Sequence, residues 1–149
     1  MNKLTALDKH RFFGTKAAAI IEELPQGQSE GCALFEIAYG KGLASYAWGE
    51  KLSFRLSTSE VYGLLGVWLG YRDELKVVRE GKQMRLVRQE KHLYLSCSQH
   101  GEPFAALPIP FEEAAIASNI LIRVIRLRYP ATSFSAIAAQ LYAANPTPR

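Results

Sequence analysis

The sequence predicts an α+β domain in which four antiparallel strands followed by one helix occur twice. Short apolar stretches, bounded by glycines, prolines and charged turns as strands usually are, come in two groups of four. Each group is followed by a longer stretch, residues 61–71 and 111–129, that is apolar on nearly all sides and therefore typical of a buried helix. Because a sheet and a helix must cover one another, we expect one pseudo-symmetric domain rather than two independent ones.

The first repeat contains four stretches with strand character, at residues 15–24, 31–39, 43–48 and 51–56. The last of them alternates polar and apolar residues, which predicts Lys51 and Arg55 on an outer face and Phe54 in the core. Ser57 and Glu60 then have the spacing of a capping box, in which the side chain of each residue accepts a hydrogen bond from the backbone amide of the other. A helix is therefore expected to begin near Thr58.

The second repeat has strand character at residues 75–80, 83–89, 92–98 and 103–109. Its helix is expected to end at Pro130, and residues 132–144 predict a short terminal helix. The chain is accordingly divided into an N-terminal tail, two repeats and a C-terminal extension, at residues 1–13, 14–72, 73–130 and 131–149.

The composition excludes several classes of protein. With 48% hydrophobic residues the 149-residue chain has enough apolar side chains for a core, which excludes intrinsic disorder. Charged residues interrupt every apolar run before it is long enough to cross a membrane, and the N-terminus lacks a signal or transit sequence, so we expect a cytoplasmic protein. Cys32 and Cys97 are then expected to stay reduced. The net charge of +4 suits an acidic polymer as partner without requiring one.

The helix at residues 111–129 carries more apolar surface than one protomer is expected to cover, which predicts self-association. The predicted interface consists of apolar residues around this helix: Ile116, Ile120, Leu121, Val124 and Ile125. The alternative is a central helix wrapped completely by its own chain.

Residues 46–51, Tyr-Ala-Trp-Gly-Glu-Lys, lead into an alternating strand and a Ser-x-x-Glu capped helix. This stretch resembles the Tyr-x-Trp-x-x-Lys element, and the strand and helix after it, of the Whirly proteins, a plant family that binds single-stranded DNA. Residues 14–19, Gly-Thr-Lys-Ala-Ala-Ala, resemble its signature Lys-Gly-Lys-Ala-Ala-Leu and share its central Lys-Ala-Ala. Residues 31–38 and 107–110 fall where the family has its next strand and its final strand.

The resemblance implies two sheets packed crosswise, with the helices at the centre of a homotetramer. It also implies binding of single-stranded DNA with little sequence preference and no catalytic centre. The signature lysine motif is tied in the family to DNA affinity and to assembly beyond the tetramer, and the departures at Gly14, Thr15 and Ala19 leave that larger assembly open.

Binding of an unpaired strand requires cations that follow the phosphates and aromatic faces on which bases stack. Side chains of both kinds lie on the predicted strands and turns, and the candidate nucleic-acid-binding residues are Lys16, Tyr46, Trp48, Lys51, Arg55, Lys76, Arg79, Arg85, Arg88 and Tyr94. Each cation taken alone is better explained as part of a solvated strand face or as an edge lysine that blocks sheet aggregation, whereas the group favours binding. Tyr46, Trp48 and Lys51 are the best local candidates, although strand parity leaves Trp48 open between the core and a stacking platform.

The remaining aromatic residues divide into two groups. Further stacking candidates are Phe12, Phe13, Phe35 and Tyr39. Residues with apolar neighbours, expected in the core, are Phe54, Trp68, Phe104 and Phe111.

Cys97 and His100 are the one Cys/His pair of zinc-site spacing, and a structural zinc site normally uses two such pairs. The sequence also offers no phosphate-binding glycine loop and no nucleophile–base arrangement, so we expect no metal, no cofactor and no enzymatic activity. The predicted function is single-stranded DNA binding with little sequence specificity, in DNA protection, recombination, repair, transfer or transcription. An RNA-binding or annealing protein and a non-binding oligomeric scaffold remain the alternatives.

Overall fold

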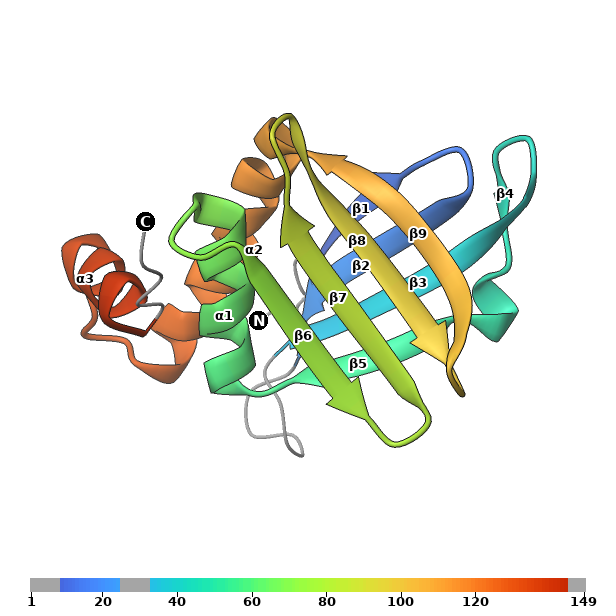
Figure 1. Ribbon diagram of the computed structural model, residues 1–149. Coiled ribbons are helices and arrows are strands. Elements are labelled where there is room, and N and C mark those ends of the chain that lie inside the picture. The colour runs from blue at the N-terminus through green and yellow to red at the C-terminus, as the bar shows by residue number, and fades with distance from the viewer. Residues whose placement is uncertain (1–8, 25–32, 145–149) are drawn as a thin grey trace, which may run out of the picture.

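The computed structural model describes residues 9–24 and 33–144. Two antiparallel sheets pack face to face, and the strands of one cross those of the other (Figure 1). Helices α1 and α2 lie side by side at one end of the sheets, and α3 lies beyond them, farthest from the opposite end (Figure 1). The predicted α+β architecture with two crossed sheets is confirmed.

The first sheet has the order β1-β2-β3-β5, and a two-residue strand, β4, extends the far end of β3. Its strands are β1 (Lys9–Phe13), β2 (Ala17–Glu23), β3 (Ala33–Gly42), β4 (Ser45–Tyr46) and β5 (Leu52–Leu56). The structure differs here from the prediction of a full strand at residues 43–48. A tight turn, with Ala44 in the left-handed region at φ 56°, and the short 3-10 helix η1 (Trp48–Glu50) break that stretch.

Strand β1 is the fourth full-length strand of this sheet, in place of the one expected at residues 43–48. Its residues, expected in an N-terminal tail, pair in antiparallel register with β2 from Lys9 opposite Glu22 to Phe13 opposite Ala18. The physical reason is burial of Phe12, which is 1% exposed and packs its ring on those of Phe35 and Trp68.

The second sheet follows the sequence order β6-β7-β8-β9 and matches the four predicted strands. Its strands are β6 (Glu74–Arg79), β7 (Lys82–Arg88), β8 (His92–Gln99) and β9 (Glu102–Pro110). Gly81 and Gly101 adopt positive φ in two of the hairpin turns, where a residue with a side chain would be strained.

Helix α1 (Thr58–Leu69) begins as predicted. The Glu60 amide donates to the Ser57 hydroxyl at 3.3 Å, and the Ser57 amide donates to the Glu60 carboxylate at 2.9 Å, so the capping box is complete. The helix ends at Gly70, whose φ of 88° is the left-handed conformation of a helix C-terminus. The other helices are α2 (Phe111–Arg128) and α3 (Phe134–Ala144), and α3 packs on α1.

The predicted oligomer interface on α2 is wrong for most of its residues, because they are buried within the protomer. Four of its five residues, Ile120, Leu121, Val124 and Ile125, are buried inside the protomer, because α1 and the first sheet cover that side of α2. Only Ile116 is exposed, at 59%. The alternative of a helix covered by its own chain therefore describes the four buried residues.

In the described part of the chain, the length and hydropathy of the helices fall short of what a membrane span requires. Cys97 is a buried free thiol, and Cys32 lies outside the described residues. No three His, Cys, Asp or Glu side chains within residues 9–24 and 33–144 form a group suited to a metal ion.

Candidate nucleic-acid interface

The outer faces of the two sheets point in opposite directions, because the sheets pack through their inner faces. On the outer face of the first sheet, here called the first-sheet face, the strand register aligns the side chains in rows across β1, β2, β3 and β5. Its cations are Lys9, Arg11, Lys51 and Arg55, all of them exposed. Its carboxylates are Glu22 and Glu36, so cations are in excess on this face.

Three aromatic residues gather on the first-sheet face and are called here the aromatic cluster: Phe13, Tyr46 and Trp48. The ring of Tyr46 lies 5.8 Å from that of Phe13 and 6.4 Å from that of Trp48, measured between centroids. Phe13 is 60% exposed, and the other two are half-buried. Rings that are held in place and only partly covered offer faces on which bases can stack.

The structure places Trp48 in the aromatic cluster and outside the core, a choice that strand parity left open. Because η1 breaks the strand before β5, Tyr46 and Trp48 do not follow the inward parity of Phe54. The Tyr46 hydroxyl donates a 2.7 Å hydrogen bond to the Gly14 carbonyl, which holds its ring over the turn between β1 and β2. Tyr46 and Trp48 thus lie outside the core, beside the exposed ring of Phe13.

Lys16 belongs to the same end of the first sheet. Its carbonyl accepts a 2.7 Å hydrogen bond from the Gly40 amide, and its side chain is exposed. A Cβ atom at Gly40 would lie 3.1 Å from the Lys16 backbone, so glycine is what allows β3 to approach this turn so closely. The turn presents Lys16 near the aromatic cluster, and its role in binding stays a prediction.

Lys51 and Arg55 lie on the first-sheet face as their alternation predicts. The Lys51 ammonium lies 3.6 Å from the Glu36 carboxylate, and the Ser53 hydroxyl donates to the same carboxylate oxygen at 3.1 Å. The Glu36 side chain is only 13% exposed, whereas that of Lys51 is 39% exposed. Lys51 therefore has access to solvent and to an anionic ligand in spite of its pairing.

Arg79 and Lys82 cover the open edge of β5 from the second sheet. Arg79 donates to the Arg55 carbonyl at 2.6 Å, and Lys82 donates to the Ser53 carbonyl while its ammonium lies 5.1 Å from the centre of the Phe54 ring. These contacts satisfy backbone acceptors that an edge strand otherwise exposes. The predicted binding residue Arg79 is thus also a structural contact between the two sheets.

Arg79 is further held by Glu60 of the capping box. Two hydrogen bonds, of 2.6 and 2.9 Å, join its guanidinium to the Glu60 carboxylate. Burial acts to raise the pKa of Glu60, but the bonds from Arg79 and from the Ser57 backbone outweigh it and lower that pKa below its ordinary value. The hydrogen bonds between Arg79 and Glu60 also raise the pKa of Arg79.

The outer face of the second sheet, called here the second-sheet face, carries Lys76, Arg85 and Tyr94. Lys76 and Arg85 are directly opposite each other on β6 and β7, and Tyr94 is 38% exposed on β8. Arg85 donates to Glu74 at 2.6 Å, and this bond lowers the pKa of Glu74. Eight of the ten predicted residues are therefore distributed over two opposite faces, whereas Arg79 lies at the edge of β5 and Arg88 at the end of α1.

Arg88 corrects the predicted set. Its guanidinium turns toward the end of α1, donates to the Val67 carbonyl at 2.6 Å, and lies 4.5 Å from the centre of the Phe111 ring. The last carbonyls of a helix are unpaired within the helix and attract cations, which explains this position. Arg88 is a helix-capping residue of the core and lies on neither outer face.

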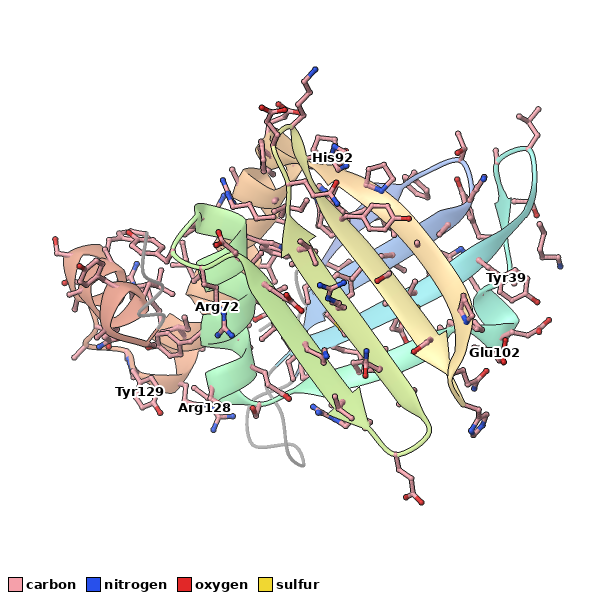
Figure 2. All side chains as sticks on the ribbon, viewed as in Figure 1. Tyr39, Arg72, His92, Glu102, Arg128 and Tyr129 are labelled. Carbon is pink, nitrogen blue, oxygen red and sulfur yellow. The ribbon has the colours of Figure 1, made fainter. Side chains whose placement is uncertain are left out.

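Two of the additional stacking candidates are also in the core. Phe12 and Phe35 are 1% and 0% exposed, because both point to the inner face of the first sheet. Phe54 and Trp68 are buried as predicted, and Phe104 and Phe111 pack partly buried against the core. Tyr39 remains accessible at the end of the sheets away from the helices, near Glu102 (Figure 2).

The sequence reasoning missed Lys9 and Arg11, which lie on the first-sheet face in the register of Phe13. The sequence signal was weak, since residues 9–11 are all polar and only Phe12 and Phe13 are apolar, so no alternation marks a strand. Five residues at the start of a chain are too few to distinguish a strand from a tail without its pairing partner.

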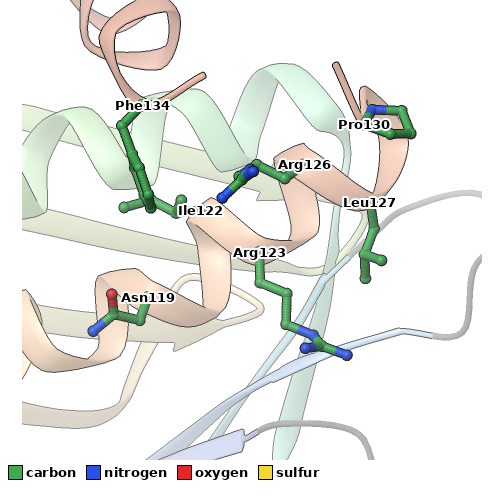
Figure 3. Close-up of a pocket in the computed structure, with 7 residues that line it drawn as sticks. All are labelled: Asn119, Ile122, Arg123, Arg126, Leu127, Pro130 and Phe134. Atoms are coloured by element: carbon green, nitrogen blue, oxygen red, sulfur yellow. The ribbon is translucent and has the colours of Figure 1, made fainter. Parts of the chain in front are cut away.

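The helical end carries a second accessible surface. A hollow of about 280 Å³ on α2 and the start of α3 is lined by Asn119, Ile122, Arg123, Arg126, Leu127, Pro130 and Phe134 (Figure 3). Leu127 and Phe134 are 40% and 61% exposed, and Ile116 lies one turn before Asn119 on the same helix. Figure 2 shows Arg128 and Tyr129 at the same end, near α3.

The fold defined by these elements is that of the Whirly proteins. WHY3 from Arabidopsis thaliana superposes with a TM-score of 0.65 at 21% identity, covering 99% of this chain and all of that one (100%). The plant transcriptional regulator PBF-2 gives a TM-score of 0.64 at 18% identity, covering 93% of this chain and 90% of that chain.

A second group of solved structures shares the fold. The trypanosome MRP1/MRP2 structures give a TM-score of 0.60 at 10% identity, covering 85% of this chain and 88% of that chain. No protein-family model and no curated protein matches the sequence. The similarity is therefore one of fold, at identities too low to transfer individual residues.

Proposed function

We propose that this protein binds single-stranded DNA through the first-sheet face. The observation that carries the proposal is the aromatic cluster of Phe13, Tyr46 and Trp48, which lies on the same face as Lys51 and beside the turn that presents Lys16. Sequence segments that resemble the Whirly family, which binds such strands, supply Lys16, Tyr46, Trp48 and Lys51, and Phe13 directly precedes the first of these segments.

The chemistry of the face suits an unpaired strand better than a duplex. Partly exposed rings gain about 1 to 3 kcal/mol for each base that stacks on them, and the faces of bases are accessible only when the bases are unpaired. Lysine and arginine side chains along the same face attract phosphates without reading sequence. Binding with little overall sequence preference follows, since every base has a stacking face.

The second-sheet face is a less suitable site. Tyr94 is the only aromatic residue among the outward-facing described residues of β6, β7 and β8, and Arg85 is engaged with Glu74 at 2.6 Å. The first-sheet face combines three aromatic rings with four exposed cations. We therefore assign the strand to the first-sheet face.

Titration of a labelled oligo-dT with the wild-type protein at two salt concentrations tests the proposal. Affinity is expected to fall with salt at a log–log slope near −0.7 for each phosphate contacted. Lys16→Ala and Lys51→Ala are each expected to weaken binding and to reduce this slope by about 0.7, while Lys91→Ala, in the exposed turn between β7 and β8, leaves both unchanged.

Two results would count against this site. Unchanged binding by both Lys16→Ala and Lys51→Ala would place the strand elsewhere on the molecule. Absence of binding to oligo-dT, oligo-U and duplex DNA even at low salt would favour the alternative of an interaction scaffold, whereas tighter binding of oligo-U would make RNA the ligand.

We further propose that the protein forms a homo-oligomer, a tetramer as the resemblance implies, through the exposed side of α2. Ile116, Leu127 and Phe134 are large apolar side chains exposed at the helical end, and Phe134 borders the hollow shown in Figure 3. This end lies away from Tyr46 and Trp48, so that assembly leaves the first-sheet face accessible (Figure 1). Light scattering is expected to give about four times the protomer mass of 16.6 kDa.

A further inference from the structure

A cavity of about 580 Å³ lies where the first-sheet face meets the turn between β6 and β7. Its volume is within the ~300–1,000 Å³ range of small-molecule sites. Leu34 and Glu36 of β3 and Ser53 and Arg55 of β5 form one wall, and Arg79, Glu80 and Lys82 form the other. Lys51, a residue of the proposed strand-binding surface, contacts Glu36 at the border of this cavity.

Opposing charges in the cavity nearly balance. Arg55, Arg79 and Lys82 face Glu36 and Glu80, and the charge of Arg79 is in addition matched by Glu60 outside the cavity. A phosphate gains little from such a site, because carboxylates repel it while the cations attract it. The balance instead favours an uncharged ligand that offers donors on one edge and acceptors on another.

Glu36 is the acceptor in this cavity with the most restricted position. Its side chain is 13% exposed, and the contacts from Ser53 and Lys51 both reach its Oε2 atom, at 3.1 and 3.6 Å. The Oε1 atom thus keeps its lone pairs for a further donor. A carboxylate held in one orientation is suited to two adjacent N–H groups of a planar ligand.

The strand register places Arg55 close to Glu36 on the same face of the sheet. Glu36 lies opposite Ser53 and Leu34 lies opposite Arg55, so Glu36 and Arg55 are diagonal neighbours on one face with the apolar side chain of Leu34 beside them. A planar ring lying over Leu34 therefore has a carboxylate near one edge and a guanidinium near another.

From this arrangement we infer that the cavity is a subsite for one guanine base of the bound strand. Guanine presents adjacent donors at N1 and N2 for the Glu36 carboxylate, and acceptors at O6 and N7 for the Arg55 guanidinium. Thymine and uracil offer one ring N–H, and adenine and cytosine offer one amino group, so none of them satisfies both edges of the cavity. The inference rests on the proposed function and adds a base preference at a single position.

Fluorescence anisotropy with labelled 15-nucleotide strands tests the subsite. The strands are all-dT, dT with one central guanine, dT with one central adenine, and dT with one central hypoxanthine, which lacks the N2 amino group. We expect the wild-type protein to bind the guanine strand about 5- to 10-fold more tightly than all-dT, as one good bidentate base contact provides, with adenine and hypoxanthine close to all-dT.

Glu36→Gln is expected to abolish the guanine preference without weakening binding to all-dT, because the variant keeps the size of the side chain and removes only its charge and one acceptor. The matched control is Glu74→Gln, which removes a strand carboxylate, likewise paired with a cation, from the second-sheet face and should keep the preference. Circular dichroism checks that both variants fold, and the hypoxanthine strand tests Glu36 with unmodified protein.

Three outcomes would overturn the inference. Equal affinities for the guanine and all-dT strands would remove the preference itself, and equal gains for guanine and adenine would show that purine stacking accounts for it. A guanine preference that survives in Glu36→Gln would place the recognition elsewhere. In each case binding to all-dT leaves the proposed function intact, whereas failure of every strand to bind contradicts the proposed function first.

Discussion

The guanidinium of Arg88 donates a 2.6 Å hydrogen bond to the carbonyl of Val67, joining strand β7 to the last turn of helix α1. The same group lies 3.4 Å from the Trp68 carbonyl and 4.5 Å from the centre of the Phe111 ring at the start of α2. One side chain thus connects the second sheet with both helices of the repeats. These contacts all join its charge to groups of the same protomer.

Arg88→Met is therefore expected to lower the free energy of unfolding by about 2 kcal/mol, because it leaves helix-end carbonyls without their charged donor. Affinity for oligo-dT should not change. Arg85→Met is the control, since its pairing with Glu74 is exposed to solvent and contributes little to stability. Urea denaturation of both variants measures the difference, and equal stabilities would show that Arg88 does not hold the helix end.

Glu60 gives the stability of the protein a dependence on pH. Since its pKa in the folded protein is lowered, its ionised form favours folding above the ordinary value of 4.5, and this contribution is lost as the pH falls through the lowered pKa. Glutamine preserves the capping-box geometry but not the charge. Glu60→Gln should therefore cost about 0.5 to 1 kcal/mol at pH 7, an amount reduced by solvent screening, and less near pH 3. Urea midpoints at the two pH values measure this, and a cost independent of pH would contradict the assigned role of the charge.

The two sides of α2 are expected to respond differently to substitution. Leu121→Ala should cost about 2 to 5 kcal/mol of protomer stability, because Leu121 is fully buried and its truncation leaves a cavity. Ile116→Asp should leave the protomer folded and reduce the mass in light scattering toward 16.6 kDa, because a carboxylate at an exposed apolar contact is costly to bury. An Ile116→Asp protein with the mass of the wild type would exclude this side of α2 from the interface.

The Cys97 thiol should be unreactive in the folded protein. Burial raises its pKa to about 12, which outweighs a smaller lowering by the Ala105 backbone, and the reactive thiolate is therefore scarce at pH 8. In a Cys32→Ser background, which leaves Cys97 as the one thiol, a thiol reagent is expected to label the protein only after denaturation. Rapid labelling of the native protein would show that β8 opens locally.

The amino-acid sequence determined the elements whose signals are local. The capping box of Ser57 and Glu60 and the alternation of residues 51–56 depend on neighbours within a few positions, and both are present as predicted. The strands of the second sheet were predicted equally well, because its hairpins join strands that are adjacent in sequence and two of its three turns carry glycine at positive φ.

Tertiary structure decided which faces these elements present. Ile120 is buried in its own protomer because α1 and the first sheet pack against α2. Arg88 contacts a helix end because α1 stops beside it. Strand β1 and the break at η1 likewise depend on pairing with distant segments. Periodicity indicates whether a side chain has an apolar or a solvated environment. Which segment supplies that environment is determined only when the whole chain has folded.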